Sequence, residues 1–76
     1  MEDSEILDLY FARSEQAIAQ TDRKYGPYCY SIANHILCNP ADAEESVNDT
    51  YYSAWKLIPP RRPQRFSTFL GKLTRN

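Results

Sequence analysis

The prolines of this chain constrain its fold more than any other feature. Proline lacks a backbone N–H and has a fixed φ, so it suits the first position of a helix and breaks most helices further along. Asn39-Pro40 therefore predicts a capped helix start, and Pro27 predicts another start after an interruption at Tyr25-Gly26. The run from Pro59 to Pro63 cannot be helical, and it predicts a stiff extended loop.

Between the prolines, apolar residues recur with helical spacing, and no stretch shows the two-residue alternation of a strand. We expect an all-α fold, a compact bundle of four helices at about 4–24, 27–38, 40–58 and 66–76, joined before the last helix by a Pro/Arg loop at 59–65. A chain of 76 residues supports one small domain with a thin core, spanning 1–76. No stop signal follows the last helix, so we expect it to be truncated at Asn76.

The apolar stripes of these segments predict the core. In the third helix they form one face of about 120°. The residues expected to point inward are Ile6, Leu9, Tyr10, Phe11 and Ala17 in the first segment; Cys29, Ile32, Ala33, Ile36 and Leu37 in the second; Ala43, Val47, Tyr51, Ala54, Trp55 and Ile58 in the third; and Phe66, Phe69, Leu70 and Leu73 in the fourth.

The formal net charge of −1 hides a strong asymmetry along the chain. All ten acidic residues precede Thr50, with only three basic residues among them, so this part carries −7. The six remaining basic residues follow, without any acid, so the second part carries +6. Such a division suggests two partners of opposite charge. Charge alone equally allows a chain whose two parts attract each other.

The third helix carries a polar face opposite its apolar one. Measured around the helix from Pro40, this face covers about 80° to 200°. An exposed Tyr in its middle is typical of binding surfaces, although a solvated face also accounts for it. The candidate binding residues are Asp42, Glu45, Asn48, Asp49 and Tyr52.

The loop and the fourth helix combine guanidinium groups with aromatic rings, a combination that binds phosphates and stacks on bases. An Asn side chain can also pair with adenine. The spacing of Phe66 and Phe69 equally predicts core packing, and a solvated loop equally accounts for the arginines. The candidate nucleic-acid contacts are Arg61, Arg62, Arg65, Lys72, Arg75 and Asn76.

Other functional classes find little support in the sequence. No apolar run approaches the roughly 18 residues of a membrane span, and an acidic N-terminus is unlike a signal peptide. His35 has no nucleophile or carboxylate arranged around it, and no metal-spaced cluster or glycine-rich phosphate loop is present. We therefore expect a cytoplasmic protein that is not an enzyme and needs no metal or cofactor.

The order of these features resembles region 2 of bacterial sigma-70-family RNA polymerase sigma factors, especially the small extracytoplasmic-function type. The residues that carry the resemblance are Tyr25-Gly26-Pro27-Tyr28, Ile36 through Glu45, Val47 through Tyr51, Ala54-Trp55, Phe66 through Leu70 and Thr74-Arg75-Asn76. The stretch from Asn39 to Trp55 is the most specific of these. The resemblance covers nearly the whole chain in order.

The resemblance implies a transcription-initiation module. It implies that Asp42, Glu45, Asn48, Asp49 and Tyr52 bind the clamp helices of the polymerase's largest subunit. It also implies that the six basic-segment residues above bind the promoter −10 element, melt it and hold a flipped non-template base. An anti-sigma factor is a further partner of this family. The alternative function is a helical protein-interaction module, such as an adaptor or a sequestered sigma remnant, that does not bind DNA.

Overall fold

Four α-helices and the connections between them account for the chain, and the computed structural model describes all 76 residues. The helices are α1 (Asp3–Phe11), α2 (Gln16–Leu37), α3 (Pro40–Leu57) and α4 (Phe66–Arg75), and no strand is present. The predicted all-α bundle of four helices is confirmed. No helix is long and apolar enough to cross a membrane.

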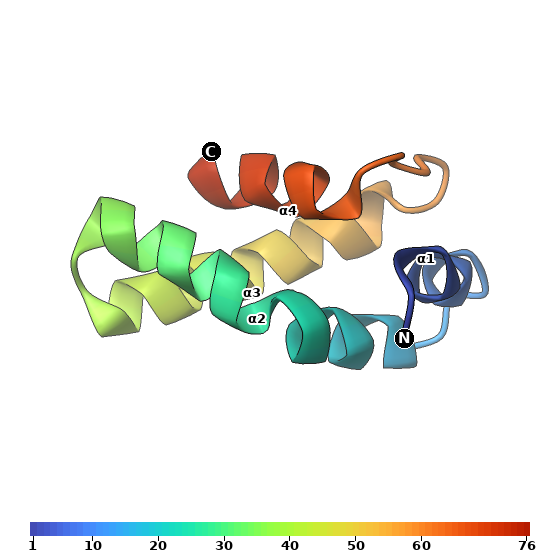
Figure 1. Cartoon of the computed structure of the whole chain (residues 1–76), viewed down its shortest axis with the longest axis horizontal. Coiled ribbons are helices and arrows are strands. Elements are labelled where there is room, and N and C mark those ends of the chain that lie inside the picture. The colour runs from blue at the N-terminus through green and yellow to red at the C-terminus, as the bar shows by residue number, and fades with distance from the viewer.

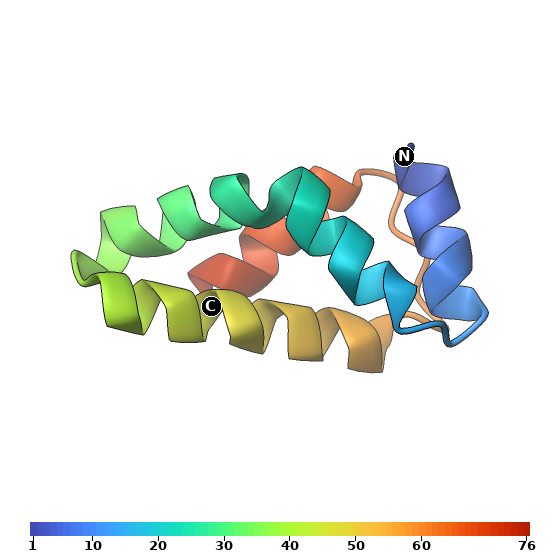
Figure 2. The same cartoon turned by 90° about the horizontal axis from the view of Figure 1, so that it is seen from below.

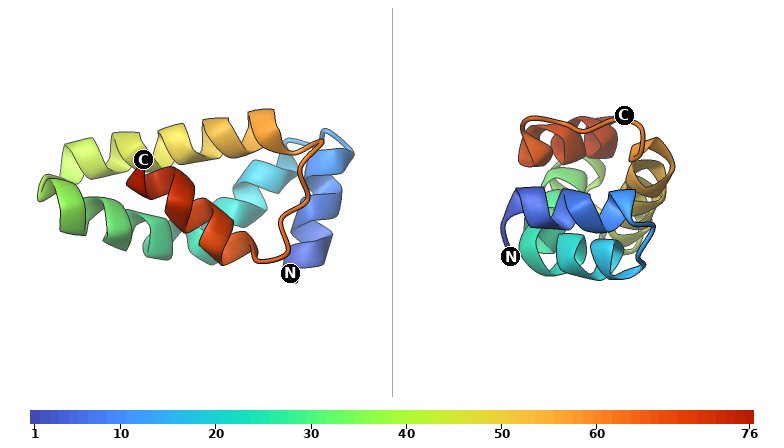
Figure 3. Two further views of the ribbon diagram at one scale, coloured as in Figure 1. Left: turned by 90° about the horizontal axis from the view of Figure 1, so that it is seen from above. Right: turned by 90° about the vertical axis from the view of Figure 1, so that its right-hand side faces the viewer.

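The long helices α2 and α3 lie side by side and antiparallel, joined by a tight turn at one end (Figure 1). Helix α4 packs on one side of this pair and contacts both helices. Helix α1 crosses the end of the pair that lies away from the turn, where α2 begins and α3 ends (Figure 3). The proline-rich segment runs past α1 on its way from α3 to α4 (Figure 3).

The core follows the predicted stripes of the third and fourth helices. Ala43, Val47, Tyr51, Ala54 and Ile58 are buried in and just after α3, and Phe66 and Leu70 are buried in α4. Buried hydroxyls are paired across helices, because an unpaired polar group in a core is costly. Tyr10 and Thr21 join α1 to α2 at 2.7 Å, and Thr50 and Thr74 join α3 to α4 at 2.9 Å.

Three residues expected in the core are exposed. Ile36 and Leu37 lie in the last turn of α2, with exposed fractions of 54% and 44%. The end of α2 extends beyond α4, which therefore does not cover it (Figure 1). Phe11, the last residue of α1, is also exposed, with the guanidinium of Arg62 5.4 Å from its ring centre.

The predicted break between the first two helices is also wrong in position. The chain turns between Phe11 and Gln16, not at Tyr25-Gly26-Pro27, and α2 continues through Pro27. Arg13 adopts a left-handed backbone with φ 55°, which ends α1. The reason lies in a tertiary contact that no local pattern in the sequence indicates.

That contact joins the Arg13 guanidinium, in the turn between α1 and α2, to the C-terminal end of α3. Its Nη1 donates to the carbonyl oxygens of Trp55 at 2.9 Å and Ile58 at 2.8 Å. The guanidinium carbon also lies 3.7 Å from the ring centre of Trp55. Carbonyl groups at a helix C-terminus lack intrahelical hydrogen-bond donors and carry partial negative charge. A guanidinium there supplies the missing donors and a compensating positive charge.

Pro27 is accommodated within α2 by a change in helix direction. A proline inside a helix removes one backbone hydrogen bond and its ring crowds the preceding turn, which bends the helix. The ribbon of α2 changes direction near its middle (Figure 2). Just before the bend, Tyr25 donates to Asp3 Oδ1 at 2.7 Å, and this carboxylate also pairs with Lys24 at 2.8 Å. These bonds tie the start of α1 to the bend.

Gly26 lets α2 and α3 share a polar contact at the bend. The Tyr51 hydroxyl of α3 donates to Asp22 Oδ1 of α2 at 2.8 Å. Burial, followed by the hydrogen bond to this carboxylate, raises the pKa of Tyr51 well above its ordinary value, so the phenol stays protonated. A Cβ on Gly26 would lie 2.8 Å from Asp22 Oδ1 and 3.5 Å from the Tyr51 hydroxyl oxygen.

We predict that Arg13→Ala destabilises the fold by about 1–3 kcal/mol, because two charge-assisted hydrogen bonds to the α3 terminus are lost. Arg13→Lys should recover only part of this loss, since an ammonium can donate to the two carbonyl oxygens but cannot stack its plane on the Trp55 ring. Urea unfolding measures both changes. Arg23→Ala is the matched control, because Arg23 is exposed and forms no ion pair. Equal stabilities for the Arg13 and Arg23 variants would contradict the capping role.

A second prediction concerns Gly26. Replacing a helical Gly by Ala normally stabilises by about 1 kcal/mol. Here Gly26→Ala should lose that gain, because the new methyl group displaces the Asp22 carboxylate from Tyr51. In an Asp22→Ala background the same substitution should be stabilising, as measured by urea unfolding. The same effect in both backgrounds would refute this coupling.

Candidate functional site

The polar face of α3 begins at a well-formed helix start. The Asn39 side chain accepts a hydrogen bond from the Asp42 N–H at 3.0 Å, and Pro40 occupies the first turn. Asp42 then lies where the helix dipole favours an acid. The cap and the proline therefore position the first carboxylate of the predicted face.

All five predicted binding residues of α3 are exposed. We call Asp42, Glu45, Asn48, Asp49 and Tyr52 the acidic α3 face. Tyr52 has the largest exposed fraction of the big hydrophobic residues, 63%, and the Lys56 ammonium lies 5.2 Å from its ring centre. None of the three carboxylates forms an ion pair within the chain.

The acidic α3 face points away from α4. Thr50, whose hydroxyl bonds Thr74 of α4, lies about 140° around the helix from Glu45. The contacts that hold α3 in the bundle thus leave this face free of other elements.

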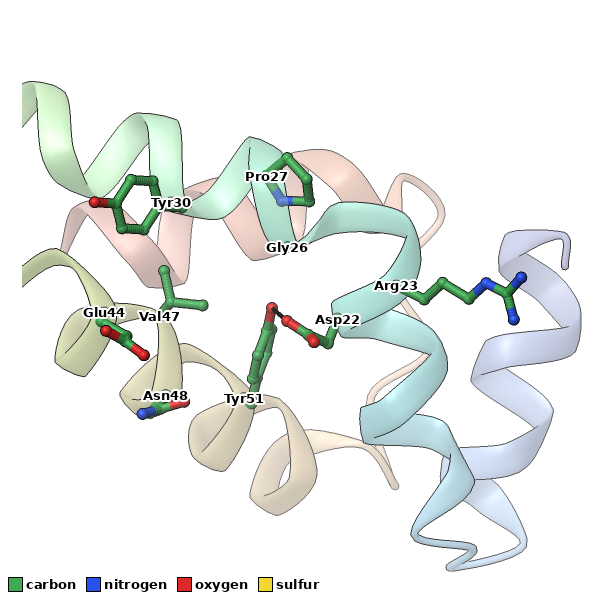
Figure 4. Close-up of a pocket in the computed structure, with 9 residues that line it drawn as sticks. All are labelled: Asp22, Arg23, Gly26, Pro27, Tyr30, Glu44, Val47, Asn48 and Tyr51. Carbon is green, nitrogen blue, oxygen red and sulfur yellow. Dashed lines mark hydrogen bonds between the residues drawn. The ribbon is translucent and has the colours of Figure 1, made fainter. Parts of the chain in front are cut away.

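A cleft of about 690 Å³ lies beside this face, between α2 and α3 (Figure 4). Tyr51 and Asp22 point toward each other at its centre, and Asn48 of the acidic α3 face forms part of its wall (Figure 4). A neighbouring hollow of about 470 Å³ shares Asp22, Asn48 and Tyr51. The lining of the cleft is Asp22, Arg23, Gly26, Pro27, Tyr30, Glu44, Val47, Asn48 and Tyr51.

Sequence reasoning missed the contribution of α2 to this region. Asp22 lines both hollows, and Glu15 lines the second, opposite the residues of α3. The packing of α2 against α3 brings these acids near Asn48 from distant parts of the chain. No pattern in the sequence places them there, because the pairing of the two helices decides it.

The basic residues of the second part divide into two groups. Lys72 and Arg75 are exposed on α4, Arg65 precedes its first turn, and Arg61 is exposed in the loop. We call Arg61, Arg65, Lys72, Arg75 and Asn76 the basic α4 surface. A hollow of about 310 Å³ at its loop end is lined by Arg61, Arg62, Pro63 and Phe69.

Arg62 has different surroundings from the other predicted nucleic-acid contacts. Its Nη2 lies 2.9 Å from Asp8 Oδ1 and donates to the Ser4 carbonyl oxygen at 3.3 Å. Its guanidinium therefore attaches the loop to α1.

A single ion pair joins the two oppositely charged parts of the chain. The structure contains two ion pairs, Lys24–Asp3 and Arg62–Asp8. Of the six basic residues after Asp49, only Arg62 is in an ion pair, and every carboxylate of α3 lacks one. Self-attraction between the two parts is therefore limited to this one ion pair, and the charges of the acidic α3 face and the basic α4 surface are unpaired within the chain.

Comparison with known proteins identifies the family. Searches of curated proteins and of solved structures gave no significant match. The family model of sigma-70 region 2 matches residues 22–76, from the first half of α2 to Asn76 and well over half of the chain. This stretch includes the acidic α3 face, the loop and the basic α4 surface. The chain belongs to the sigma-70 region 2 family, the non-enzymatic domain of sigma factors that acts in transcription initiation.

Proposed function

We propose that this chain joins RNA polymerase to promoter DNA through two separate surfaces. The acidic α3 face binds the clamp helices of the largest polymerase subunit, and the basic α4 surface binds the non-template strand of the −10 element. The observation that carries the proposal is the pair of surfaces with opposite, internally unpaired charge. Membership of the sigma-70 region 2 family supports polymerase and promoter DNA as the partners.

The polymerase contact is supported by charge and shape together. A basic coiled coil presents long cationic side chains, which the carboxylates of Asp42, Glu45 and Asp49 attract. Tyr52 provides an exposed aromatic ring of the kind that contributes strongly to binding energy. The adjoining cleft, with Asp22 and Glu44 in its walls, gives room for a protruding side chain.

The DNA contact is supported by the position of the basic groups. Arg65 directly precedes α4, and Lys72 and Arg75 lie on it. Guanidinium and ammonium groups bind phosphates. Melting of the −10 element is then driven by binding energy. Unstacking costs a few kcal/mol, and phosphate contacts and the capture of a flipped base offset this cost. The chain makes or breaks no bond in this function. Partnership with the polymerase would give it the same location, the bacterial cytoplasm.

The alternative function is a protein-interaction module that binds through the acidic α3 face without touching DNA. An anti-sigma factor is a partner of suitable class for such a module. The basic α4 surface favours the first function, since a pure adaptor has no need of several unpaired cations on one helix. The extracytoplasmic-function subtype stays a prediction from resemblance.

We predict that Asp49→Arg weakens binding to the isolated clamp helices by about tenfold or more, because a repulsive charge replaces an attractive one within the acidic α3 face. Isothermal titration calorimetry measures the affinity, and circular dichroism checks the fold. Glu5→Arg is the control with the same change in net charge, placed in the first turn of α1 at a residue that forms no ion pair. Equal affinities for the two variants would exclude the acidic α3 face as the contact.

We also predict that the double variant Arg65→Ala/Lys72→Ala binds single-stranded −10 DNA more weakly, and that its affinity depends less on salt. Loss of two phosphate contacts should lower the slope of log K against log salt by about 1.4. Fluorescence anisotropy over a salt series measures this slope. Arg23→Ala, which removes a cation from α2, should leave the slope unchanged. An unchanged slope in the double variant would exclude phosphate contacts by these two side chains.

A further inference from the structure

The second half of α2 lacks acidic side chains. From Tyr25 to Leu37 it contains no carboxylate, and α4, which packs against it, contains none either. The acids of the chain are therefore absent from both walls of the groove between these helices. An anion that enters this groove meets no carboxylate from either helix.

Gly71 brings a phenol and a guanidinium to the same point of this groove. A Cβ on Gly71 would lie 3.0 Å from the Tyr28 hydroxyl oxygen and 3.2 Å from Arg75 Nη1. Ile32 Cδ1 lies 3.6 Å from that position. The missing side chain thus lets a residue of α2 and a cation of α4 converge over bare helix backbone.

A hollow of about 240 Å³ continues from this point along the groove. Its lining residues are Ser31, Ile32, His35, Ile36 and Arg75. The side chains of Ser31, His35 and Arg75 are exposed and form no hydrogen bond or ion pair within the chain. Tyr28 also keeps its hydroxyl unpaired, with an exposed fraction of 40%.

These groups match the chemistry of a phosphodiester. Guanidinium, hydroxyl and imidazole groups all donate hydrogen bonds to phosphate oxygens. Ile32 and Ile36 add an apolar surface on which the sugar can rest. The combination of unpaired donors, one unpaired cation and no carboxylate favours a nucleic-acid strand over a protein partner.

We infer that the strand bound by the basic α4 surface continues onto α2, where Ser31, His35 and Arg75 contact one of its phosphates and Tyr28 lies beside it. This inference rests on the proposed function, since it extends the path of the same strand. It adds to the DNA contact a helix that no sequence pattern assigned to it. The occupant is single-stranded DNA, and its recognition there is by backbone and not by base edge.

The test places a carboxylate in this carboxylate-free groove. His35→Glu and Ser31→Glu should each weaken binding of a labelled single strand of about 12 nucleotides by about tenfold. Gln16→Glu adds the same charge at the other end of α2, and it should change the affinity far less. Anisotropy measures binding, and circular dichroism checks each fold. Equal effects for the groove variants and Gln16→Glu would overturn the inference.

Amide NMR signals of the full chain distinguish this inference from the proposed function. When the same DNA is titrated into the unmodified protein, the signals of residues 28–36 should shift together with those of α4. Shifts confined to α4 and the loop would refute the α2 contact and leave the proposed function standing, with this groove free for a protein. Absence of any shift would overturn both.

Discussion

The guanidinium of Arg13 holds together the end of the bundle from which the basic segment emerges. It bonds the carbonyl oxygens of Trp55 and Ile58 and stacks on the Trp55 ring. Through these contacts the α1–α2 turn secures the end of α3 where the proline-rich loop starts. Arg62 attaches the same loop to α1. Both arginines therefore hold the chain at the end of the bundle where it leaves α3 and turns toward α4.

The packing of α4 against α3 keeps the basic α4 surface away from the acidic α3 face. Thr50 and Thr74 fix α4 against one side of α3, and the acidic α3 face lies about 140° around that helix. The internal ion pairs involve α1, α2 and the loop, so both surfaces keep their charges available. This arrangement suits the proposed function, because neither partner needs to displace an internal ion pair from the acidic α3 face or from the basic α4 surface.

Much of the fold could be predicted from sequence because it depends on local rules. The helical periods of α3 and α4, the Asn39 cap and the loop between Pro59 and Arg65 all follow from residues near one another in the chain. The exposure of the acidic α3 face follows from the same period, whereas its partner stays a prediction. The position of the first turn could not be predicted, because Arg13 takes its left-handed conformation beside carbonyls more than 40 residues away.

The sequence by itself determined the helix content, the apolar face of α3 and the division of charge into −7 and +6. The tertiary structure decided that Pro27 lies inside a bent α2, that Asp22 meets Tyr51, and that Ile36 and Leu37 remain uncovered. It also decided which charged side chains are unpaired, so that a chain with a net charge of −1 has one acidic and one basic surface. The physical reason is that periodicity and caps act over one or two helical turns, whereas ion pairs and helix contacts depend on which elements meet.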